Sequence, residues 1–572
     1  MTTPHSPSNG INRRSLLART VAAGIAGTAA ITASAQEKVA PKPAADPSPN
    51  LKAPIITLKA GSLRGLREGK TLSFLGIKYA DAERFGPPKP VQPWGDVKNA
   101  QVWGACCPSP IPDTVSFDDF VFPHRYWTAN ENCQYLNVWT QSLTPARKKP
   151  VMVWMHGGGF TNGASMEGYA YDGRSLSEFG DVVVVSVNHR LNVIGTLDVS
   201  AYGPEYANSR NTGMADLVAS LQWVHDNIEN FGGDPGNVTI FGQSGGGGKV
   251  SRLLHMPSAK GLFHKVICES TSPVDYRNTD PAKTIQAQRA IAAETLKVLN
   301  LTAADIGKLK AVPYLSLLAA ATTATQTVAR QTGMAVAVGG WDPVADDVNV
   351  LREFCDWAES IPYMIGNVLS EFSSNLNGSQ FDKNEWSTKE IDSRLTAAFG
   401  AKKDDIVAEY RKLYPRRKVQ DVLFLDSRFR PWTKTMIELK AEKAKAAVYS
   451  YMFTYEYPVN GGVTAFHCSE IAFAFHALAE PHIHLSTGGG PSALALQDKV
   501  SQAWVNFART GNPSQPGLVW KPWTAAGHET MVFDTVSELR SLNDDKLLSL
   551  MPTPGPLGTP ALAPAAKAPG RG

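Results

Sequence analysis

The 572-residue sequence lacks a long hydrophobic run, a strong charge of either sign and an internal repeat. No segment after the first forty residues is apolar for long enough to cross a bilayer. The net charge is only +4, and no cluster of Lys and Arg is interleaved with aromatic residues, so we expect no nucleic-acid partner. Because no motif recurs at a fixed period, a repeat architecture is not expected either.

Cysteine is also scarce, and the six residues are Cys106, Cys107, Cys133, Cys268, Cys355 and Cys468. No pair has zinc-finger spacing, so we predict neither a metal site nor a cofactor. Cys268 ends the apolar run 265–268 and is expected to be a buried, small hydrophobic residue. A bond from Cys133 to Cys106 or Cys107 would close a loop of about 26 residues and contribute roughly 3 kcal/mol. The spacing alone leaves that choice open.

Residues 1–35 have the three parts of an export signal in the right order. Residues 12–17 (NRRSLL) resemble a twin-arginine motif, residues 21–31 are mildly apolar, and residues 33–35 (ASA) fit a small-x-small cleavage site. A disordered basic tail or a membrane anchor is the alternative. Cleavage would lower the net charge to +1 and leave no stable membrane anchor. The signal predicts a periplasmic or secreted protein in an oxidising compartment.

The rest of the chain alternates between apolar, β-branched runs and longer helical patterns. Residues 36–52 form a Pro/Ala-rich linker, and residues 551–572 form a Pro/Ala/Gly-rich tail that we expect to be disordered. Strands are expected at 150–155, 182–187, 238–241, 266–268, 363–365 and 448–453, and a helix at 216–231. Unbroken apolar strands separated by helices predict an α/β fold, with a mostly parallel sheet covered by helices on both faces. Reactive groups in such sheets collect at the carboxyl ends of the strands.

Two glycine-rich motifs each follow an expected strand. Residues 242–246 (GQSGG) place Ser244 in a sharp strand-to-helix turn, where glycines relieve strain and the hydroxyl meets a helix N-terminus. An idle serine in a glycine-rich turn would give the same letters, so this motif alone is modest evidence. Residues 156–160 (HGGGF) follow the strand ending at Met155 and leave backbone N–H groups free to bind an oxyanion. Together the two motifs predict an acyl-transfer site.

The chain resembles the type B carboxylesterases, a cholinesterase-like family with the α/β-hydrolase fold. Beyond the two glycine motifs, the resemblance rests on residues 76–80 (GIKYA), 84–88 (RFGPP), 131–139 (ENCQYLNVW), 188–191 (NHRL), 230–239 (NFGGDPGNVT) and 504–513 (WVNFARTGNP). These segments extend over nearly the whole chain after the linker. The resemblance therefore implies one hydrolase domain over residues 53–550.

The family order of catalytic residues is Ser, Glu, His, which implies that Glu371 is the acid that follows Ser244. Glu371 lies shortly after the strand expected at 363–365. Without the resemblance, Glu353, Asp356 and Glu359 would be equally good candidates.

The resemblance also identifies the base. The histidines that follow Glu371 are His467, His476, His482, His484 and His528. Residues 467–471 (HCSEI) resemble the family motif H-G-x-E-[LI], which implies that His467 is the general base. His482 and His484 could be argued as metal ligands, but a lone H-x-H in a loop is more often a solvated turn.

The same comparison implies the remaining site residues. The oxyanion donors are the N–H groups of Gly158, Gly159 and Gly245. Family precedent places a disulfide between Cys133 and the cysteine that precedes proline, Cys107.

Four positions depart from the family pattern in ways that bear on the site. Gln243 stands where cholinesterases carry Glu, which argues against a cationic substrate and for neutral esters. Cys468 replaces a glycine, and we interpret it as a packing residue whose bulk could shift the histidine loop. Tyr126 and Trp127 could line the acyl or alcohol pocket, but capping of the core is the favoured role.

Two further departures concern structure. Glycines at 245–248 replace an Ala-Gly start of the helix at a cost of up to about 1 kcal/mol each, which close packing or ligand approach could compensate. Asn132 replaces an Asp, while Glu131 stays available to pair with Arg84.

The resemblance implies a serine hydrolase that cleaves small carboxylic esters through an acyl-enzyme. A binding or adhesion protein on the same fold is the alternative, although the presence of Ser244, Glu371 and His467 argues against it. Amide or carbamate hydrolysis by the same triad stays open, as do the acyl and alcohol sizes and the oligomeric state.

Overall fold

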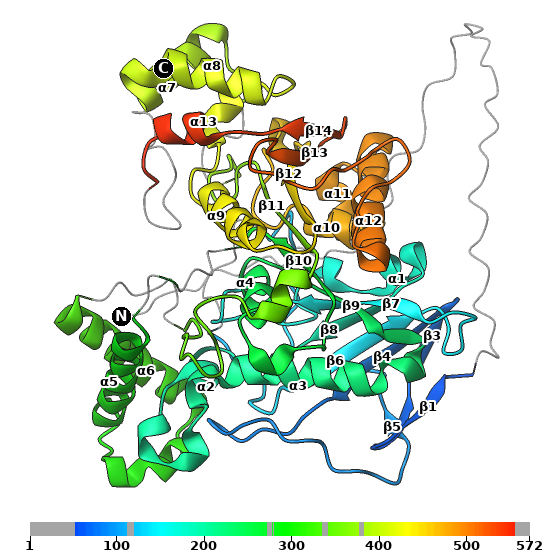
Figure 1. Ribbon diagram of the computed structural model, residues 1–572, viewed down its shortest axis with the longest axis vertical. Coiled ribbons are helices and arrows are strands. Elements are labelled where there is room, and N and C mark those ends of the chain that lie inside the picture. Colours follow the sequence, from blue (N-terminus) through cyan, green and yellow to red (C-terminus); the bar gives the residue numbers. More distant parts are fainter. Residues whose placement is uncertain are drawn as a thin grey trace, which may run out of the picture. The chain divides into compact units, whose positions relative to one another are not determined.

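The structure is a computed structural model that describes residues 52–110, 119–271, 277, 280–333, 341–376 and 383–554 (Figure 1). The export signal, almost all of the linker and most of the tail lie outside these residues, so the predictions for them stay predictions. In the described ranges, no helix is both long and apolar enough to span a bilayer.

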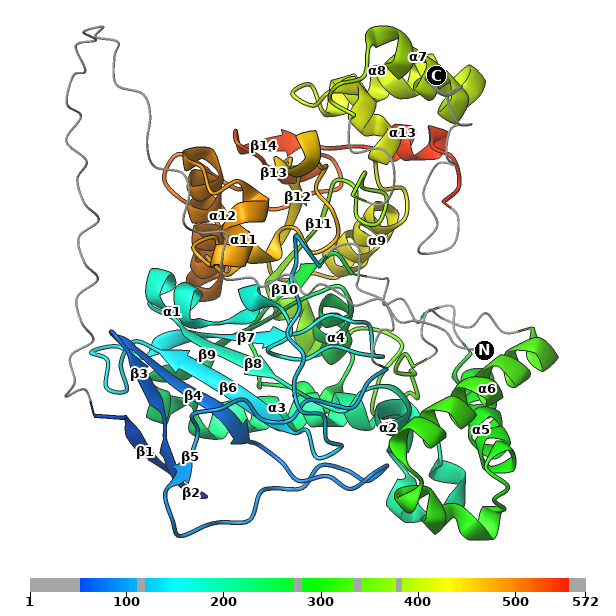
Figure 2. The ribbon, with the colours of Figure 1, turned by 180° about the vertical axis from the view of Figure 1, so that it is seen from behind.

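An eleven-stranded sheet forms the centre of the fold, in the order β14-β13-β12-β11-β10-β9-β7-β8-β6-β4-β3 (Figures 1 and 2). The strands from β13 to β8 in this order are parallel to one another. At the two ends of the sheet, β14 pairs antiparallel with β13, and β6, β4 and β3 each pair antiparallel with the strand before them in the order. A small second sheet has the order β1-β2-β5. The predicted α/β architecture is therefore confirmed. The strands are β1 Ile55–Leu58, β2 Gly61–Arg64, β3 Leu66–Glu68, β4 Thr71–Lys78, β5 Lys98–Asn99, β6 Tyr135–Thr140, β7 Lys149–Met155, β8 Val183–Val187, β9 Gly233–Gln243, β10 Lys265–Glu269, β11 Tyr363–Val368, β12 Val448–Phe453, β13 Glu529–Phe533 and β14 Glu538–Ser541.

Helices cover both faces of the sheet because successive side chains of a buried strand point in opposite directions. Val151 and Val153 of β7 belong to the core cluster under α3, α4, α5, α6 and α9. Met152 and Trp154 of the same strand pack on the other face, with α1, α10 and α12. The α-helices are α1 Arg174–Gly180, α2 Asn192–Thr196, α3 Thr212–Asn227, α4 Gly245–Leu253, α5 Pro281–Val298, α6 Tyr314–Thr332, α7 Thr388–Phe399, α8 Lys403–Leu413, α9 Phe429–Glu442, α10 Ile471–Ala474, α11 Pro481–Thr487, α12 Pro491–Thr510 and α13 Asp545–Leu550.

The predicted strands are all present, and the boundaries differ where the chain turns. β12 has the predicted bounds, whereas β9 begins at Gly233, five residues before the expected start. The predicted helix at 216–231 is displaced: α3 begins at Thr212 and ends at Asn227. Residues 228–231 form a tighter 3-10 turn, which Gly232 ends with a left-handed φ of 80°.

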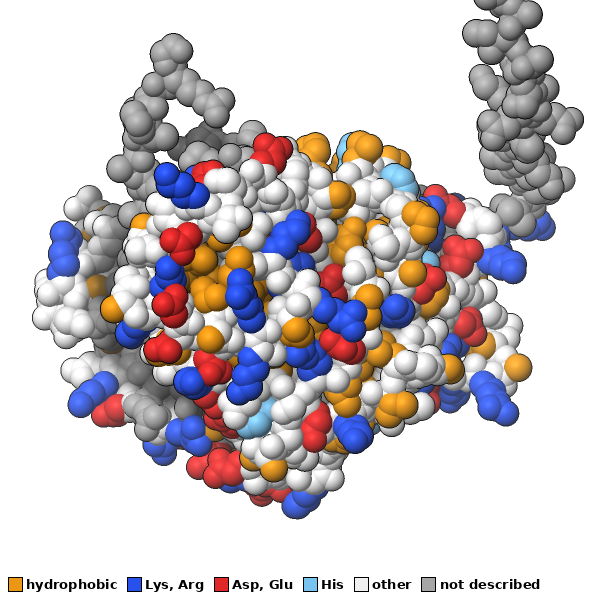
Figure 3. All heavy atoms as spheres, turned by 90° about the horizontal axis from the view of Figure 1, so that it is seen from above, with side chains coloured by type: hydrophobic (Ala, Val, Ile, Leu, Met, Phe, Trp, Pro, Cys, Tyr) orange, Lys and Arg blue, Asp and Glu red, His pale blue; other side chains and the backbone are white. Residues whose placement is uncertain are grey.

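One face of the surface is shown in Figure 3, where Lys and Arg side chains lie among Asp and Glu, with hydrophobic side chains between them. This mixture of signs agrees with the small net charge of the sequence.

Candidate active site

The strand-to-helix turn at Ser244 is the centre of the site. β9 ends at Gln243 and α4 begins at Gly245, so Ser244 alone makes the turn, with φ 57° and ψ −123°. A non-glycine residue pays about 1–3 kcal/mol for such backbone angles, which tertiary structure must hold in place. The Ser244 N–H donates to the Glu269 carbonyl at 2.8 Å, and its carbonyl accepts from the Gly248 N–H at 3.0 Å. Its hydroxyl makes no hydrogen bond to any described residue.

The glycines around Ser244 are required by close packing. A Cβ on Gly245 would lie 2.4 Å from both N and Cα of Gly159, and one on Gly246 would lie 2.0 Å from the Met155 carbonyl oxygen. Real Cβ atoms essentially never approach other atoms this closely. Close packing therefore compensates for the low helix propensity of residues 245 and 246.

The loop after β7 runs beside this turn. Gly158 and Gly159 have left-handed φ angles of 79° and 61°, and a Cβ on Gly158 would lie 2.3 Å from Asn162 Oδ1. Among the residues that the structure describes, nothing accepts a hydrogen bond from the N–H of Gly158, Gly159 or Gly245. Because Gly245 packs directly on Gly159, these free donors are gathered next to Ser244.

Glu371 and His467 lie on two loops at the same edge of the sheet. Their side chains are joined by a short contact of 2.5 Å between Glu371 Oε2 and His467 Nδ1. Glu371 Oε1 accepts a hydrogen bond from the backbone N–H of Val368 at 3.0 Å. The backbone N–H of His467 donates to the backbone carbonyl of Glu371 at 3.2 Å. The Phe372 ring stacks on the imidazole with centroids 4.3 Å apart. These contacts direct Nδ1 to the carboxylate and leave Nε2 for a different partner.

Gln243 connects His467 to the turn at Ser244. Its Nε2 lies 3.3 Å from His467 Nε2 and 3.4 Å from His467 Nδ1, so the amide packs against the ring and makes no single directed bond. The Cys468 thiol donates to Gln243 Oε1 at 3.2 Å. The structure thus places His467 against the residue that precedes Ser244, while Ser244 and His467 share no hydrogen bond.

Three further buried carboxyl groups, which the sequence did not indicate, lie around the site: Asp426 and Glu470 interact with Glu371, and Glu269 interacts with Glu470. Burial and the Glu371 charge raise the pKa of Asp426 to about 8, and burial raises the pKa of Glu269 to about 7. Burial, with the charges of Glu269 and Glu371, also raises the pKa of Glu470. Glu470 could have been noticed as part of the 467–471 motif, whereas Glu269 and Asp426 carry no motif.

Glu353 and Glu359, two of the alternative acids considered from the sequence, lie in other surroundings. Glu353 pairs with Lys443 at 2.5 Å, and Glu359 pairs with Lys445 at 2.8 Å. In both pairs the lysine side chain is more than half exposed. These carboxylates therefore belong to surface ion pairs.

All six cysteines are free thiols in the structure, so the expected disulfide between Cys107 and Cys133 is not formed there. Cys107 and Cys133 are nevertheless buried side by side, and burial together with the hydrogen bond that the Cys133 thiol shares with Cys107 raises the pKa of Cys133. The Cys106 thiol instead contacts the Thr128 carbonyl at 3.6 Å. Cys268 is fully buried, as predicted.

The favoured role of Tyr126 and Trp127 was wrong. Their exposed fractions are 69% and 45%, so neither ring caps the core. The Trp127 indole N–H donates to the Trp103 carbonyl at 3.3 Å, which holds the loop at the surface. The predicted pair of Arg84 with Glu131 is confirmed, with Nε donating to Oε2 at 2.7 Å.

His482 and His484 are in α11, and they make separate contacts. The His482 ring packs on Tyr169 with centroids 4.9 Å apart, and His484 Nδ1 lies 3.3 Å from the Leu478 carbonyl. Across the described ranges, no group of three or more His, Cys, Asp and Glu is arranged to hold a metal ion.

Comparison with known proteins places the chain in a family. The model of the carboxylesterase family matches residues 52–546. A para-nitrobenzyl esterase from Bacillus subtilis is 32% identical over 513 residues, covering 88% of this chain and 99% of the relative. The solved structure of a Clostridium hathewayi esterase, described as hydrolysing aliphatic aromatic polyesters, is 40% identical with a TM-score of 0.80, and the match covers 88% of this chain and 98% of that one. The chain belongs to the carboxylesterase family, has the α/β-hydrolase fold and is a carboxylic ester hydrolase.

Proposed function

We propose that the chain hydrolyses neutral carboxylic esters with Ser244 as nucleophile, His467 as general base and Glu371 as the acid that orients the base. The observation that carries this proposal is the short contact between Glu371 and His467 beside the strained turn that presents the free Ser244 hydroxyl. The N–H groups of Gly158, Gly159 and Gly245 are the proposed oxyanion hole.

In the first half of the reaction, His467 Nε2 takes the Ser244 proton as Oγ attacks the ester carbonyl. The carbonyl oxygen becomes an oxyanion that accepts hydrogen bonds from the glycine N–H groups, each worth about 3 kcal/mol. When the C–O bond breaks, His467 gives its proton to the leaving alcohol. In the second half, His467 deprotonates water, which attacks the acyl-enzyme and releases the acid and Ser244.

A neutral substrate fits the charges around the nucleophile. Position 243 carries an amide, and this amide is fully buried against His467. A pKa of about 8 keeps Asp426 largely protonated at neutral pH, burial with the charges of Glu269 and Glu371 raises the pKa of Glu470, and Glu371 is engaged with His467. The raised pKa values reduce the negative charge that could attract a cationic alcohol at these groups.

The first test is hydrolysis of p-nitrophenyl butyrate by the wild type and by Ser244→Ala. We expect kcat to fall about 10⁴-fold or more, since the nucleophile is lost while substrate binding is retained. Equal rates would contradict the proposed nucleophile. Hydrolysis of the matching p-nitroanilide separates ester from amide preference.

The second test compares acetylcholine with 3,3-dimethylbutyl acetate, its neutral isostere. We expect a higher kcat/KM for the neutral ester. A preference for the choline ester would contradict the proposed substrate class.

We also propose that residues 1–35 export the chain and that the oxidising compartment joins Cys107 to Cys133, within one catalytic domain over 53–550. The two buried thiols already lie in contact. Peptide mass spectrometry of the unreduced exported protein checks both points, because it reports the mature N-terminus and any cross-linked pair.

A further inference from the structure

Lys249 is a buried cation that the proposed reaction does not use. It lies in α4, five residues after Ser244, and its exposed fraction is 0%. Its Nζ donates to the His156 carbonyl at 2.8 Å and to the Gly157 carbonyl at 3.3 Å. Within the described chain, no carboxylate lies within ion-pair distance of Nζ. The site therefore holds an ammonium group almost entirely with backbone oxygens, an arrangement that is costly to bury.

The two carbonyls belong to the loop that carries the proposed oxyanion donors. In a trans peptide unit, the C=O of one residue and the N–H of the next point in opposite directions. The carbonyl of Gly157 shares its peptide unit with the N–H of Gly158. A cation that binds this carbonyl from one side therefore directs the Gly158 N–H to the other side.

Charge also strengthens the donor. A positive group at a carbonyl oxygen polarises the peptide unit and makes its N–H a better hydrogen-bond donor. The Gly157 carbonyl accepts a second hydrogen bond, from His156 Nδ1 at 3.0 Å. Gly157 itself lies against the nucleophile, because a Cβ built on it would be 3.5 Å from Ser244 Cβ.

We propose that Lys249 is a positioning residue of the oxyanion hole, which fixes and polarises the Gly157–Gly158 peptide unit from the side opposite the substrate. This inference rests on the proposed roles of Ser244 and Gly158. Lys249 touches no reacting atom, so it acts through the loop alone.

The proposal has a consequence for pH dependence. Burial lowers the pKa of Lys249 to about 7, against the opposing effects of the Glu167 carboxylate and the Cys107 thiol, while Arg252 lowers it further. The facing His156 and His189 imidazoles are uncharged at neutral pH, since burial lowers the pKa of both. As pH rises through about 7, Lys249 loses its charge. A neutral amine still donates hydrogen bonds but polarises less, so kcat should fall to a lower plateau and not to zero.

The chain offers a matched control. Lys440, in α9, is also a buried lysine whose Nζ donates to two backbone carbonyls, of Ala358 at 2.8 Å and of Glu359 at 3.3 Å. Burial lowers its pKa to about 8. Lys440→Met therefore removes the same kind of contact outside the proposed site, and Lys249→Met removes it beneath the oxyanion loop.

The experiment measures p-nitrophenyl butyrate kinetics from pH 6 to 9 and inhibition by an aryl trifluoromethyl ketone. Ser244 adds to this ketone, its proton moves to His467, and the resulting hemiketal oxyanion occupies the oxyanion hole. Titration with a phosphonate ester gives the concentration of active sites in each variant. For Lys249→Met, we expect kcat per active site to fall about tenfold or more with KM nearly unchanged, and ketone affinity to fall by a similar factor.

We also expect the alkaline decrease in kcat to disappear in Lys249→Met and to persist in Lys440→Met. Unchanged ketone affinity per active site in Lys249→Met would overturn the inference, as would an equal loss of affinity in Lys440→Met. If Lys249→Met does not fold, Lys249→Gln provides the same comparison, since it keeps a donor but removes the charge. The proposed function fails separately, through an active Ser244→Ala.

Discussion

At the residue scale, the site contains side chains in backbone conformations that favour glycine. Ser244, Glu371 and Cys468 have φ angles of 57°, 46° and 75°. The family motif has glycine at position 468, and the left-handed φ gives the physical reason. The cysteine at this position is therefore strained, while its thiol holds the Gln243 amide.

We predict that Cys468→Gly raises the free energy of unfolding by about 1 kcal/mol, because glycine adopts this φ without a steric penalty. Urea unfolding measures the change. The control is Cys468→Ala, which removes the thiol but keeps the strained Cβ. Equal stability of the Gly and Ala variants would contradict the prediction.

A second residue-scale prediction concerns Gly245. In Gly245→Ala, the new Cβ would meet the Gly159 backbone at 2.4 Å, so the loop of the proposed oxyanion hole must move. We expect kcat to fall about tenfold or more, since one hole donor contributes roughly 3 kcal/mol. Gly307→Ala is the control, because nothing lies within 4 Å of a Cβ at that position. A Gly245→Ala enzyme with wild-type kcat would show that the loop tolerates the shift.

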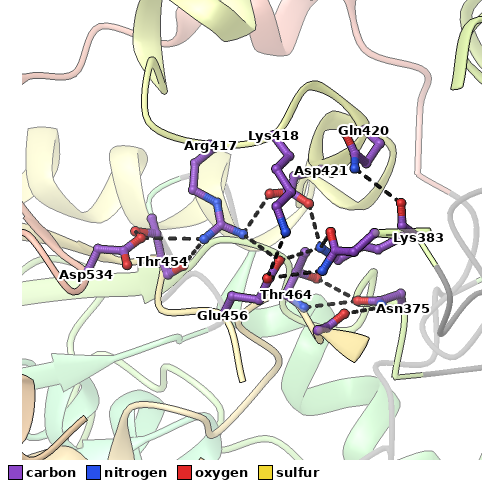
Figure 4. Close-up of polar contacts among 12 residues, drawn as sticks. Asn375, Lys383, Arg417, Lys418, Gln420, Asp421, Thr454, Glu456, Thr464 and Asp534 are labelled. Carbon is purple, nitrogen blue, oxygen red and sulfur yellow. Dashed lines mark hydrogen bonds and ion pairs between the residues drawn. The ribbon is translucent and has the colours of Figure 1, made fainter. Parts of the chain in front are cut away.

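At the element scale, two loops bring Glu371 and His467 together, the proposed acid and base. Asn375, in the loop after Glu371, donates to the Gly462 carbonyl at 3.0 Å and accepts from the Thr464 N–H at 3.0 Å. Figure 4 shows Asn375 and Thr464 beside a cluster of ion pairs in which Lys383 binds Asp421 at 2.9 Å. This cluster ties Lys383, which follows that loop in the chain, to Asp421 and Glu456.

We predict that Asn375→Ala lowers kcat and costs about 2–3 kcal/mol of stability, because two buried backbone groups lose their partner and the His467 loop loosens. Asn211→Ala is the matched control. Asn211 likewise bonds one backbone N–H and one backbone C=O, both of Val344, at 3.2 and 3.1 Å. Both variants should lose similar stability in urea. Only Asn375→Ala should lose kcat, and an equal loss in both would show a general effect of destabilisation.

The sequence predicted the elements whose signals are local. Apolar runs located the parallel strands from β7 to β12 but missed β13, and glycine motifs located the loops after β7 and β9, because turn geometry depends on neighbouring residues. The exposure of Tyr126 and Trp127 could not be predicted, because a loop aromatic has no periodicity. Nor could the placement of Lys249 or Asp426, since burial of a charged group depends on contacts with residues that are distant in sequence.

At the scale of the whole molecule, buried carboxyl groups with raised and with lowered pKa values make the free energy of unfolding change with pH in opposite directions. Burial and the charge of Glu371 raise the pKa of Asp426 to about 8. For Asp544, burial is outweighed by the ion pairs with Arg430 and Lys434, which lower its pKa. Between about pH 4 and 8 the unfolded chain ionises at Asp426 while the folded chain stays protonated there, so this group makes stability fall as pH rises. Asp544 contributes stability that is fully present above about pH 4 and is lost at lower pH.

The last prediction follows from this difference of sign. Asp426→Asn keeps an oxygen that can accept from the Arg430 N–H, which Asp426 binds at 2.7 Å, but it cannot ionise. Relative to the wild type, we expect the variant to gain stability progressively from pH 5 to 8, by up to about 1.4 kcal/mol per pH unit, and then to level off. Asp544→Asn should instead show a constant loss of stability over the same range. Urea unfolding at four pH values measures both, and a pH-independent difference for Asp426→Asn would show that its carboxyl is ionised in the folded protein throughout.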